Sequence, residues 1–162
     1  MFTKCSNGHM LSELQPGQVL ARGLCRHLFA HDFVGLTEFV PARGLRVDVI
    51  ALGPKGQIWV IECKSSRADF MADNKWHGYL EWCDRFFWCV DGAFPTDILP
   101  SGAGLIVADG YDAQILEYGP ETALAPARRK ALTLKICRTA MQRVNGYQDP
   151  RPADRFSAVL PK

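Results

Sequence analysis

Two apolar segments near the middle of the chain carry charged residues that a buried strand normally lacks. Asp48 lies within residues 46–52, and Glu62 and Lys64 lie within residues 59–64. Because successive side chains of a strand alternate between its faces, Glu62 and Lys64 are predicted to share one face. The Gly-Pro-Lys-Gly sequence between the segments is typical of a turn, so the segments are predicted to form a hairpin with Asp48 beside Glu62. Two carboxylates and one ammonium group then share a small site.

The length and composition predict one domain with a hydrophobic core, because 48% of the 162 residues are hydrophobic. We assign residues 11–146 to this domain and residues 1–10 and 147–162 to irregular termini. No long apolar run is present, so we expect a cytoplasmic protein without membrane contact. The six cysteines include no C-x-x-C pair, which favours buried free thiols over zinc ligands or disulfides. No glycine-rich phosphate loop is present, so no nucleotide cofactor is expected.

Periodicity and turn residues predict an α/β fold with a mixed central sheet flanked by helices. The predicted strands are residues 33–40, 45–52, 57–64, 85–90, 104–108 and 114–118. The predicted helices are residues 15–30, 74–83 and 125–144, with a cap at Asp73 for the second and a short helix opened by Ser66 and Asp69. The first three strands are predicted to form an antiparallel meander. A helical crossover then makes the fourth strand parallel to the third.

The predicted site has the donor atoms that hydrolysis of a phosphodiester requires. The carboxylates of Asp48 and Glu62 suit Mg²⁺ or Mn²⁺, and the main-chain carbonyl of Cys63 is a further candidate ligand. Metal binding there would activate a water molecule and neutralise charge on the phosphate. Lys64 would orient the hydroxide or stabilise the transition state electrostatically. The alternative interpretation is a buried ion pair, but desolvation makes such a pair a weak source of stability.

These residues resemble the motif of the PD-(D/E)XK nuclease superfamily. In this chain, 13 residues separate Asp48 from Glu62-Cys63-Lys64. A longer series of matches between Val19 and Val144 resembles the MmcB family of DNA-repair proteins. The matching positions are Arg46-x-Asp48, Glu62-Cys63-Lys64-Ser65-Ser66, Asp69-Phe70, Asp73-x-Lys75-Trp76, Tyr79, Cys83-Asp84 and Gly104-Leu105-Ile106-Val107-Ala108-Asp109. The resemblance implies a restriction-endonuclease-like core and a metal-dependent nuclease that hydrolyses DNA during repair or processing.

The chain departs from the superfamily pattern in its first predicted helix. Many members supply a further Glu from that helix, yet residues 15–30 contain no acidic residue. Glu38, in the first predicted strand, is the candidate to occupy the equivalent place as a third metal ligand. The alternative function is therefore a nuclease-fold module without catalytic activity, which binds nucleic acid or a repair partner.

The candidate DNA contacts are Arg43 and Arg46, which lie next to Asp48, and Lys75. A second basic region extends from residue 122 to residue 148, which contain no Asp or Glu. Its basic residues are Arg128, Arg129, Lys130, Lys135, Arg138 and Arg143. Either a solvent-exposed helix face or DNA contact explains them, because one helix cannot direct six charges at the same duplex.

Overall fold

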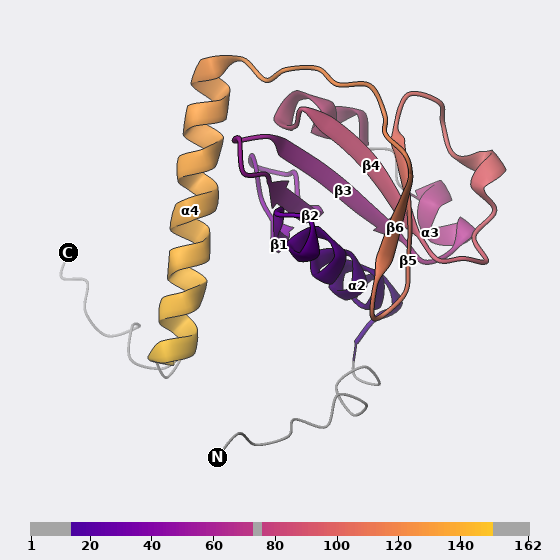
Figure 1. Cartoon of the computed structure of the whole chain (residues 1–162), viewed down its shortest axis with the longest axis horizontal. Helices are drawn as coiled ribbons and strands as arrows, with labels where there is room; N and C mark the ends of the chain where they lie inside the picture. The colour runs from indigo at the N-terminus through magenta and orange to yellow at the C-terminus, as the bar shows by residue number, and fades with distance from the viewer. Residues whose placement is uncertain (1–13, 73–75, 151–162) are drawn as a thin grey trace, which may run out of the picture.

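In the computed structural model, which describes residues 14–72 and 76–150, six strands form one sheet in the order of the sequence (Figure 1). The strands are β1 (Val34–Phe39), β2 (Val47–Leu52), β3 (Ile58–Lys64), β4 (Arg85–Val90), β5 (Gly104–Ala108) and β6 (Ala113–Glu117). The pairs β1–β2, β2–β3 and β5–β6 are antiparallel, whereas β3–β4 and β4–β5 are parallel. The predicted meander, the parallel fourth strand and the mixed α/β class are therefore confirmed.

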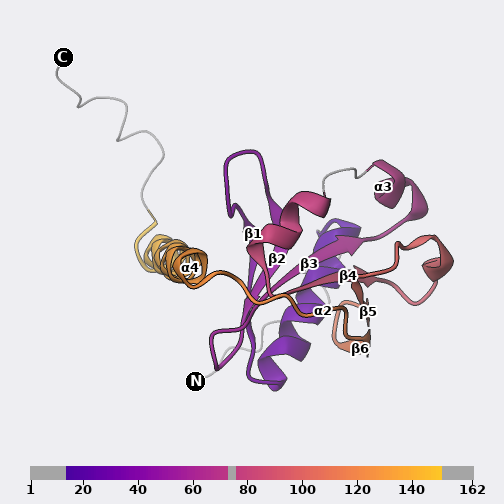
Figure 2. The ribbon, with the colours of Figure 1, turned by 90° about the horizontal axis from the view of Figure 1, so that it is seen from above.

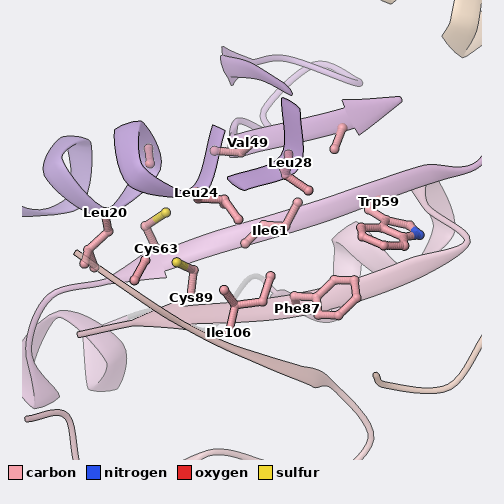
Figure 3. Packing of buried hydrophobic residues seen from close by; sticks show 13 residues of the cluster. Leu20, Leu24, Leu28, Val49, Trp59, Ile61, Cys63, Phe87, Cys89 and Ile106 are labelled. Atoms are coloured by element: carbon pink, nitrogen blue, oxygen red, sulfur yellow. The ribbon is translucent and has the colours of Figure 1, made fainter. Parts of the chain in front are cut away.

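One face of the sheet is covered by the helix α2 (Pro16–Ala30). Leu20, Leu24 and Leu28 recur at helical spacing and are almost completely buried, which is the amphipathic pattern that predicted this helix. Figure 3 shows these leucines packing on apolar side chains of the strands, including Ile61 and Phe87. This layer fixes α2 against β2, β3 and β4.

The opposite face carries an aromatic cluster together with α3 (Arg67–Ala72) and the 3₁₀ helix η1 (Trp76–Trp82). The sequence predicted an α-helix over residues 74–83, and this assignment of helix type was wrong. In a 3₁₀ helix, side chains three residues apart lie above one another. Trp76 and Tyr79 both stack on Phe86, with ring centroids 5.6 and 6.4 Å away. The predicted cap at Asp73 lies outside the described residues.

A short 3₁₀ turn, η2 (Thr96–Ile98), precedes β5. The described cysteines are free thiols. Cys63, Cys83 and Cys89 are buried, as predicted, and burial raises the pKa of Cys83 to about 12. Cys137, however, is exposed on the last helix.

The last helix, α4 (Pro126–Gln148), lies beside β1 at the edge of the sheet (Figures 1 and 2). Its buried Leu132 and Ile136 join the apolar cluster on the face opposite α2. The helix continues past the predicted end at Val144, so the assignment of Tyr147 and Gln148 to an irregular terminus was wrong. Gly146 lowers helix propensity by only about 1 kcal/mol, and the N–H of Asp149 donates to the carbonyl of Asn145 at 2.8 Å, which continues the helical hydrogen bonding.

Most basic side chains of α4 bond to the rest of the protein. Arg128 contacts Glu81, and Arg129 contacts Asp84. Lys135 donates to the carbonyl of Pro41 at 3.0 Å, and Arg143 donates to the carbonyl of Thr37 at 2.6 Å. These four cations therefore attach the helix to the strand β1, to η1 and to neighbouring loops. The sequence-based alternatives of a solvated face or a DNA contact apply only to the remaining two.

The carboxylate of Asp84 joins segments that are far apart in the sequence. It accepts hydrogen bonds from the N–H of Ile58 at 2.7 Å, from the N–H of Leu124 at 2.9 Å, and from both terminal nitrogens of Arg129 at 2.7 and 2.5 Å. Only 5% of Asp84 is exposed. Burial by itself raises the pKa of Asp84, but the hydrogen bonds from Arg129 and the main chain outweigh this effect and hold it below its usual value.

Arg129→Met is expected to lower the free energy of unfolding by about 3 kcal/mol, because it leaves a buried carboxylate without its counter-ion. Arg128→Met is the matched control, since the Arg128–Glu81 pair is exposed and such pairs contribute at most about 1 kcal/mol. Urea denaturation of both variants measures the difference. Equal stabilities would contradict the role assigned to the Asp84–Arg129 pair.

The same comparison repeated at low pH tests the charge of Asp84. Because its pKa is lower in the folded protein than in the unfolded chain, its stabilising effect is complete above about pH 4. The effect disappears as the pH falls through the folded pKa. The stability gap between wild type and Arg129→Met is therefore expected to narrow below pH 4.

Candidate functional site

A cavity of about 990 Å³ brings the three predicted catalytic residues together. Asp48 of β2 and Glu62 and Lys64 of β3 line it. The rest of its wall comes from the first turns of α2, the end of β1, α3 and η1, and includes Gln15, Gln18, Glu38, Arg46, Asp69 and Tyr79. The cavity therefore forms where the meander, α2 and the crossover segment meet.

The antiparallel pairing of β2 and β3 interlocks the two carboxylates. The register pairs Val49 with Ile61, which places Asp48 opposite Glu62. Asp48 Oδ2 accepts a hydrogen bond from the N–H of Cys63 at 2.8 Å, and Glu62 Oε1 accepts one from the N–H of Asp48 at 3.2 Å. Each carboxylate is thus held by the main chain of the other strand, as the predicted hairpin requires.

Lys64 lies beside Glu62 on the same strand, with its Nζ 3.9 Å from Glu62 Oε2. Both side chains are strongly buried, with 4% of Glu62 and 6% of Lys64 exposed. The ammonium group also lies 6.0 Å from the ring centroid of Trp88, on the adjacent strand β4. These contacts confirm the prediction that Glu62 and Lys64 share a face, and they place a cation at the carboxylate pair.

The surroundings of Asp48 disfavour its ionised form. Burial is the main cause that raises the pKa of Asp48, and the nearby carboxylates of Glu38 and Asp69 raise it further. The N–H of Cys63 and the charge of Lys64 act in the opposite direction without reversing the shift. An additional cation nearby would therefore favour the ionised form of Asp48.

Glu38 lines the cavity, but its carboxylate forms an ion pair with an arginine. Its Oε2 lies 3.0 Å from Nε of Arg46. Among residues 14–72 and 76–150, no group of three or more His, Cys, Asp or Glu is arranged to hold a metal ion. Glu38 is therefore not assembled with Asp48 and Glu62 into a three-ligand site, and its role as a ligand stays a prediction.

The backbone of Glu38 has an unusual conformation, because its φ of 50° is a value that residues other than glycine rarely adopt. Arg143 of α4 donates to the carbonyls of Thr37 and Glu38, at 2.6 and 3.1 Å, and so fixes the peptide groups on both sides of this residue's Cα. The end of β1 is thus held in a strained form where it borders the cavity, which is typical of functional sites.

The predicted DNA-contacting residues differ in position. Arg46 lines the cavity with an exposed side chain, whereas the exposed Arg43 does not line it. Lys75 lies outside the described residues. Tyr79, whose O–H donates to the carbonyl of Arg46 at 3.1 Å, supports the cavity wall. The sequence predicted that Ser66 and Asp69 cap a short helix, and the N–H of Asp69 does donate to Ser66 Oγ at 3.2 Å. The place of Asp69 in the cavity wall was not predicted, because contacts between distant segments leave no local pattern in the sequence.

Glu38→Gly is expected to raise the free energy of unfolding by about 1 kcal/mol, because glycine adopts positive φ without steric cost. Glu38→Ala retains the Cβ atom and is expected to give no such gain. Both variants lose the exposed pair with Arg46, so their difference reports the backbone strain. Urea denaturation measures it, and a Glu38→Gly variant no more stable than Glu38→Ala would contradict the strain.

The open mixed sheet and the interlocked carboxylates beside a buried lysine define an α/β protein with an acidic site on adjacent strands. The family model described as DNA repair protein MmcB-like matches residues 9–151, and the chain belongs to this family. The structure is similar to that of SPO1766, a protein of unknown function from Silicibacter pomeroyi. The two share 62% sequence identity with a TM-score of 0.85, over 89% of this chain and 99% of that one.

No curated protein matches the chain. The family assignment confirms the resemblance to MmcB proteins and indicates a role in DNA repair. Within the described ranges, none of the helices is long and apolar enough to cross a bilayer.

Proposed function

We propose that the protein is a Mg²⁺- or Mn²⁺-dependent nuclease that hydrolyses DNA phosphodiester bonds during repair, with a core of the PD-(D/E)XK type. The observation that supports this proposal best is the interlocked pair Asp48 and Glu62 with Lys64 beside it in an accessible cavity. A buried and a half-buried carboxylate next to a buried ammonium group contribute little to stability, because desolvation is costly. The two carboxylates are, however, well suited to bind a cation.

The donor set fits a divalent metal ion. One oxygen of each carboxylate accepts a hydrogen bond from a main-chain N–H. This bond fixes the orientation of the carboxylate and does not involve its second oxygen. The raised pKa of Asp48 indicates surroundings that favour an added positive charge. Mg²⁺ often uses one or two protein carboxylates and keeps several waters, so Asp48 and Glu62 suffice, with the carbonyl of Cys63 as a further ligand. Glu38 would join them only if it left Arg46.

When bound, the metal ion would lower the pKa of a water molecule and neutralise charge on the phosphate. The protein's own contribution is positional and electrostatic. Lys64 is held near Glu62 in a buried position, where its charge acts strongly on negative charge that develops on the phosphate oxygens. Arg46, exposed at the cavity wall, would contact a phosphate next to the reacting one. Arg43 and Lys75 are further proposed DNA contacts.

A second candidate function is a module of the same fold that binds nucleic acid or a repair partner without cutting. Two observations favour it. The first turn of α2 contains no acidic residue, and Gln18 there uses its Oε1 to accept the N–H of Gln15 at 3.0 Å. In addition, the described residues include no site with three acidic or metal-binding side chains. Metal affinity and cleavage decide between the two functions.

Asp48→Asn is expected to abolish both Mn²⁺ binding, measured by calorimetry, and DNA cleavage, because it removes a charged ligand. Lys64→Ala retains both carboxylates, so metal binding is expected to persist while cleavage falls by roughly 10²–10³-fold. Asp97→Asn and Lys55→Ala, at exposed positions outside the cavity, are the matched controls and should behave like wild type.

The outcomes separate the two functions. Wild-type protein that binds DNA but neither binds Mn²⁺ nor cuts any member of a panel of single-stranded, duplex, gapped and branched substrates would support the non-cutting module. Equal cleavage by Lys64→Ala and wild type would remove Lys64 from the mechanism.

DNA affinity is expected to fall steeply with salt concentration, because the predicted contacts join arginine and lysine to phosphates. Arg46→Ala should weaken binding to different sequences by a similar factor and reduce the salt slope by about 1. Arg26→Ala, which removes an exposed arginine of α2 outside this cavity, is the control. A salt-independent affinity measured by fluorescence anisotropy would contradict this account of DNA binding.

A further inference from the structure

The outer side of α4 carries a row of exposed apolar side chains. Leu134, Met141 and Val144 are between 51% and 61% exposed, and Cys137 between them is also exposed. Their spacing of three or four residues places them on one side of a helix, along about 15 Å of its length. We call these four residues the outer stripe. Single exposed apolar residues are common, but a contiguous row on a long helix marks an interaction surface.

The inner side of α4 is already occupied. Leu132 and Ile136 are buried against the rest of the protein, and Arg129, Lys135 and Arg143 bond to it. The outer stripe is therefore not a second core face of the same domain. Figure 2, which views α4 along its axis, shows the helix beside the sheet, with no other described element on its far side.

The charged residues of α4 itself are all positive. Residues 122–148 contain no Asp or Glu. Arg128, Arg129, Lys135 and Arg143 bond within the protein, so that Lys130 and Arg138 are the basic residues of α4 without a bonding partner in the described part of the chain. Lys130 lies one helical turn before Leu134, and Arg138 lies one turn after it. The surface thus combines an apolar row with two unneutralised cations.

We propose that the outer stripe docks an acidic amphipathic helix of a partner protein. Such a helix would cover the apolar row with its own apolar residues and would neutralise Lys130 and Arg138 with carboxylates, in the manner of helix pairs with flanking charges. A second copy of α4 offers only the same cations. Nucleic acid would contact the cations and leave the apolar row in water. A membrane surface attracts helices whose polar face is basic, whereas most cations of α4 are bound to the protein.

The test uses a synthetic helical peptide with leucines at heptad a and d positions and glutamates beside them. Its affinity for the full-length protein is measured by fluorescence anisotropy. We expect binding that weakens at least tenfold in the double variant Leu134→Ser/Met141→Ser. Phe29→Ser, which alters an exposed apolar residue on α2, is the matched control and should bind like wild type. Circular dichroism and thermal unfolding establish that the variants remain folded.

Charge reversal tests the second half of the proposal. Arg138→Glu is expected to weaken binding of the glutamate peptide and to give measurable affinity for the same peptide with lysines in place of glutamates. Absence of binding by wild type, or binding that the double variant leaves unchanged, would overturn the proposal. A wild-type dimer in light scattering that the double variant abolishes would instead assign the stripe to a second copy, and stripe-dependent binding to anionic vesicles would assign it to a membrane.

Discussion

The buried carboxylate of Asp84 holds together the parts of the molecule that hydrogen bonding within the sheet leaves separate. It binds the N–H at the start of β3, the N–H of Leu124 before α4, and the guanidinium of Arg129 within that helix. Its own N–H donates to the carbonyl of Ile58 at 2.7 Å. The energetic reason for this arrangement is that a buried carboxylate is tolerated only when its oxygens are fully bonded, so the surrounding segments are constrained to positions that supply donors. The place of α4 beside the sheet follows from this constraint.

At the candidate active site, by contrast, burial and neighbouring carboxylates disfavour the ionised form of Asp48. Asp48 and Glu62 are oriented by main-chain N–H groups of the neighbouring strand, so no additional side chain is needed to hold them. Lys64 supplies one positive charge, and the carboxylates of Glu38 and Asp69 add to the negative charge felt by Asp48. A cation bound beside Asp48 would favour its ionised form. The strained backbone at Glu38, fixed by Arg143, shows that α4 also shapes this cavity.

The two ends of the sheet therefore contain carboxylates in different roles. Asp84 has a lowered pKa because hydrogen bonds from Arg129 and the main chain outweigh burial, whereas Asp48 has a raised pKa because burial dominates. The first is a structural ion pair and the second is a candidate metal ligand. The basic residues of α4 show the same division of labour, with most of them attaching the helix and two remaining outside.

The sequence by itself determined the meander, the parallel fourth strand and the alignment of Asp48, Glu62 and Lys64, because these features follow from side-chain alternation and turn residues within short segments. The places of β5 and β6 in the sheet came only from the tertiary structure. Only the tertiary structure decided the pairing of Glu38 with Arg46, the contact of Asp84 with Arg129, and the 3₁₀ form of η1. Each of these depends on groups brought together from distant parts of the chain or on packing against the sheet. Local periodicity contains no information about such contacts. The sequence therefore left a solvated face and DNA contact as alternatives for the basic helix, whereas most of its charges bond to other parts of the protein.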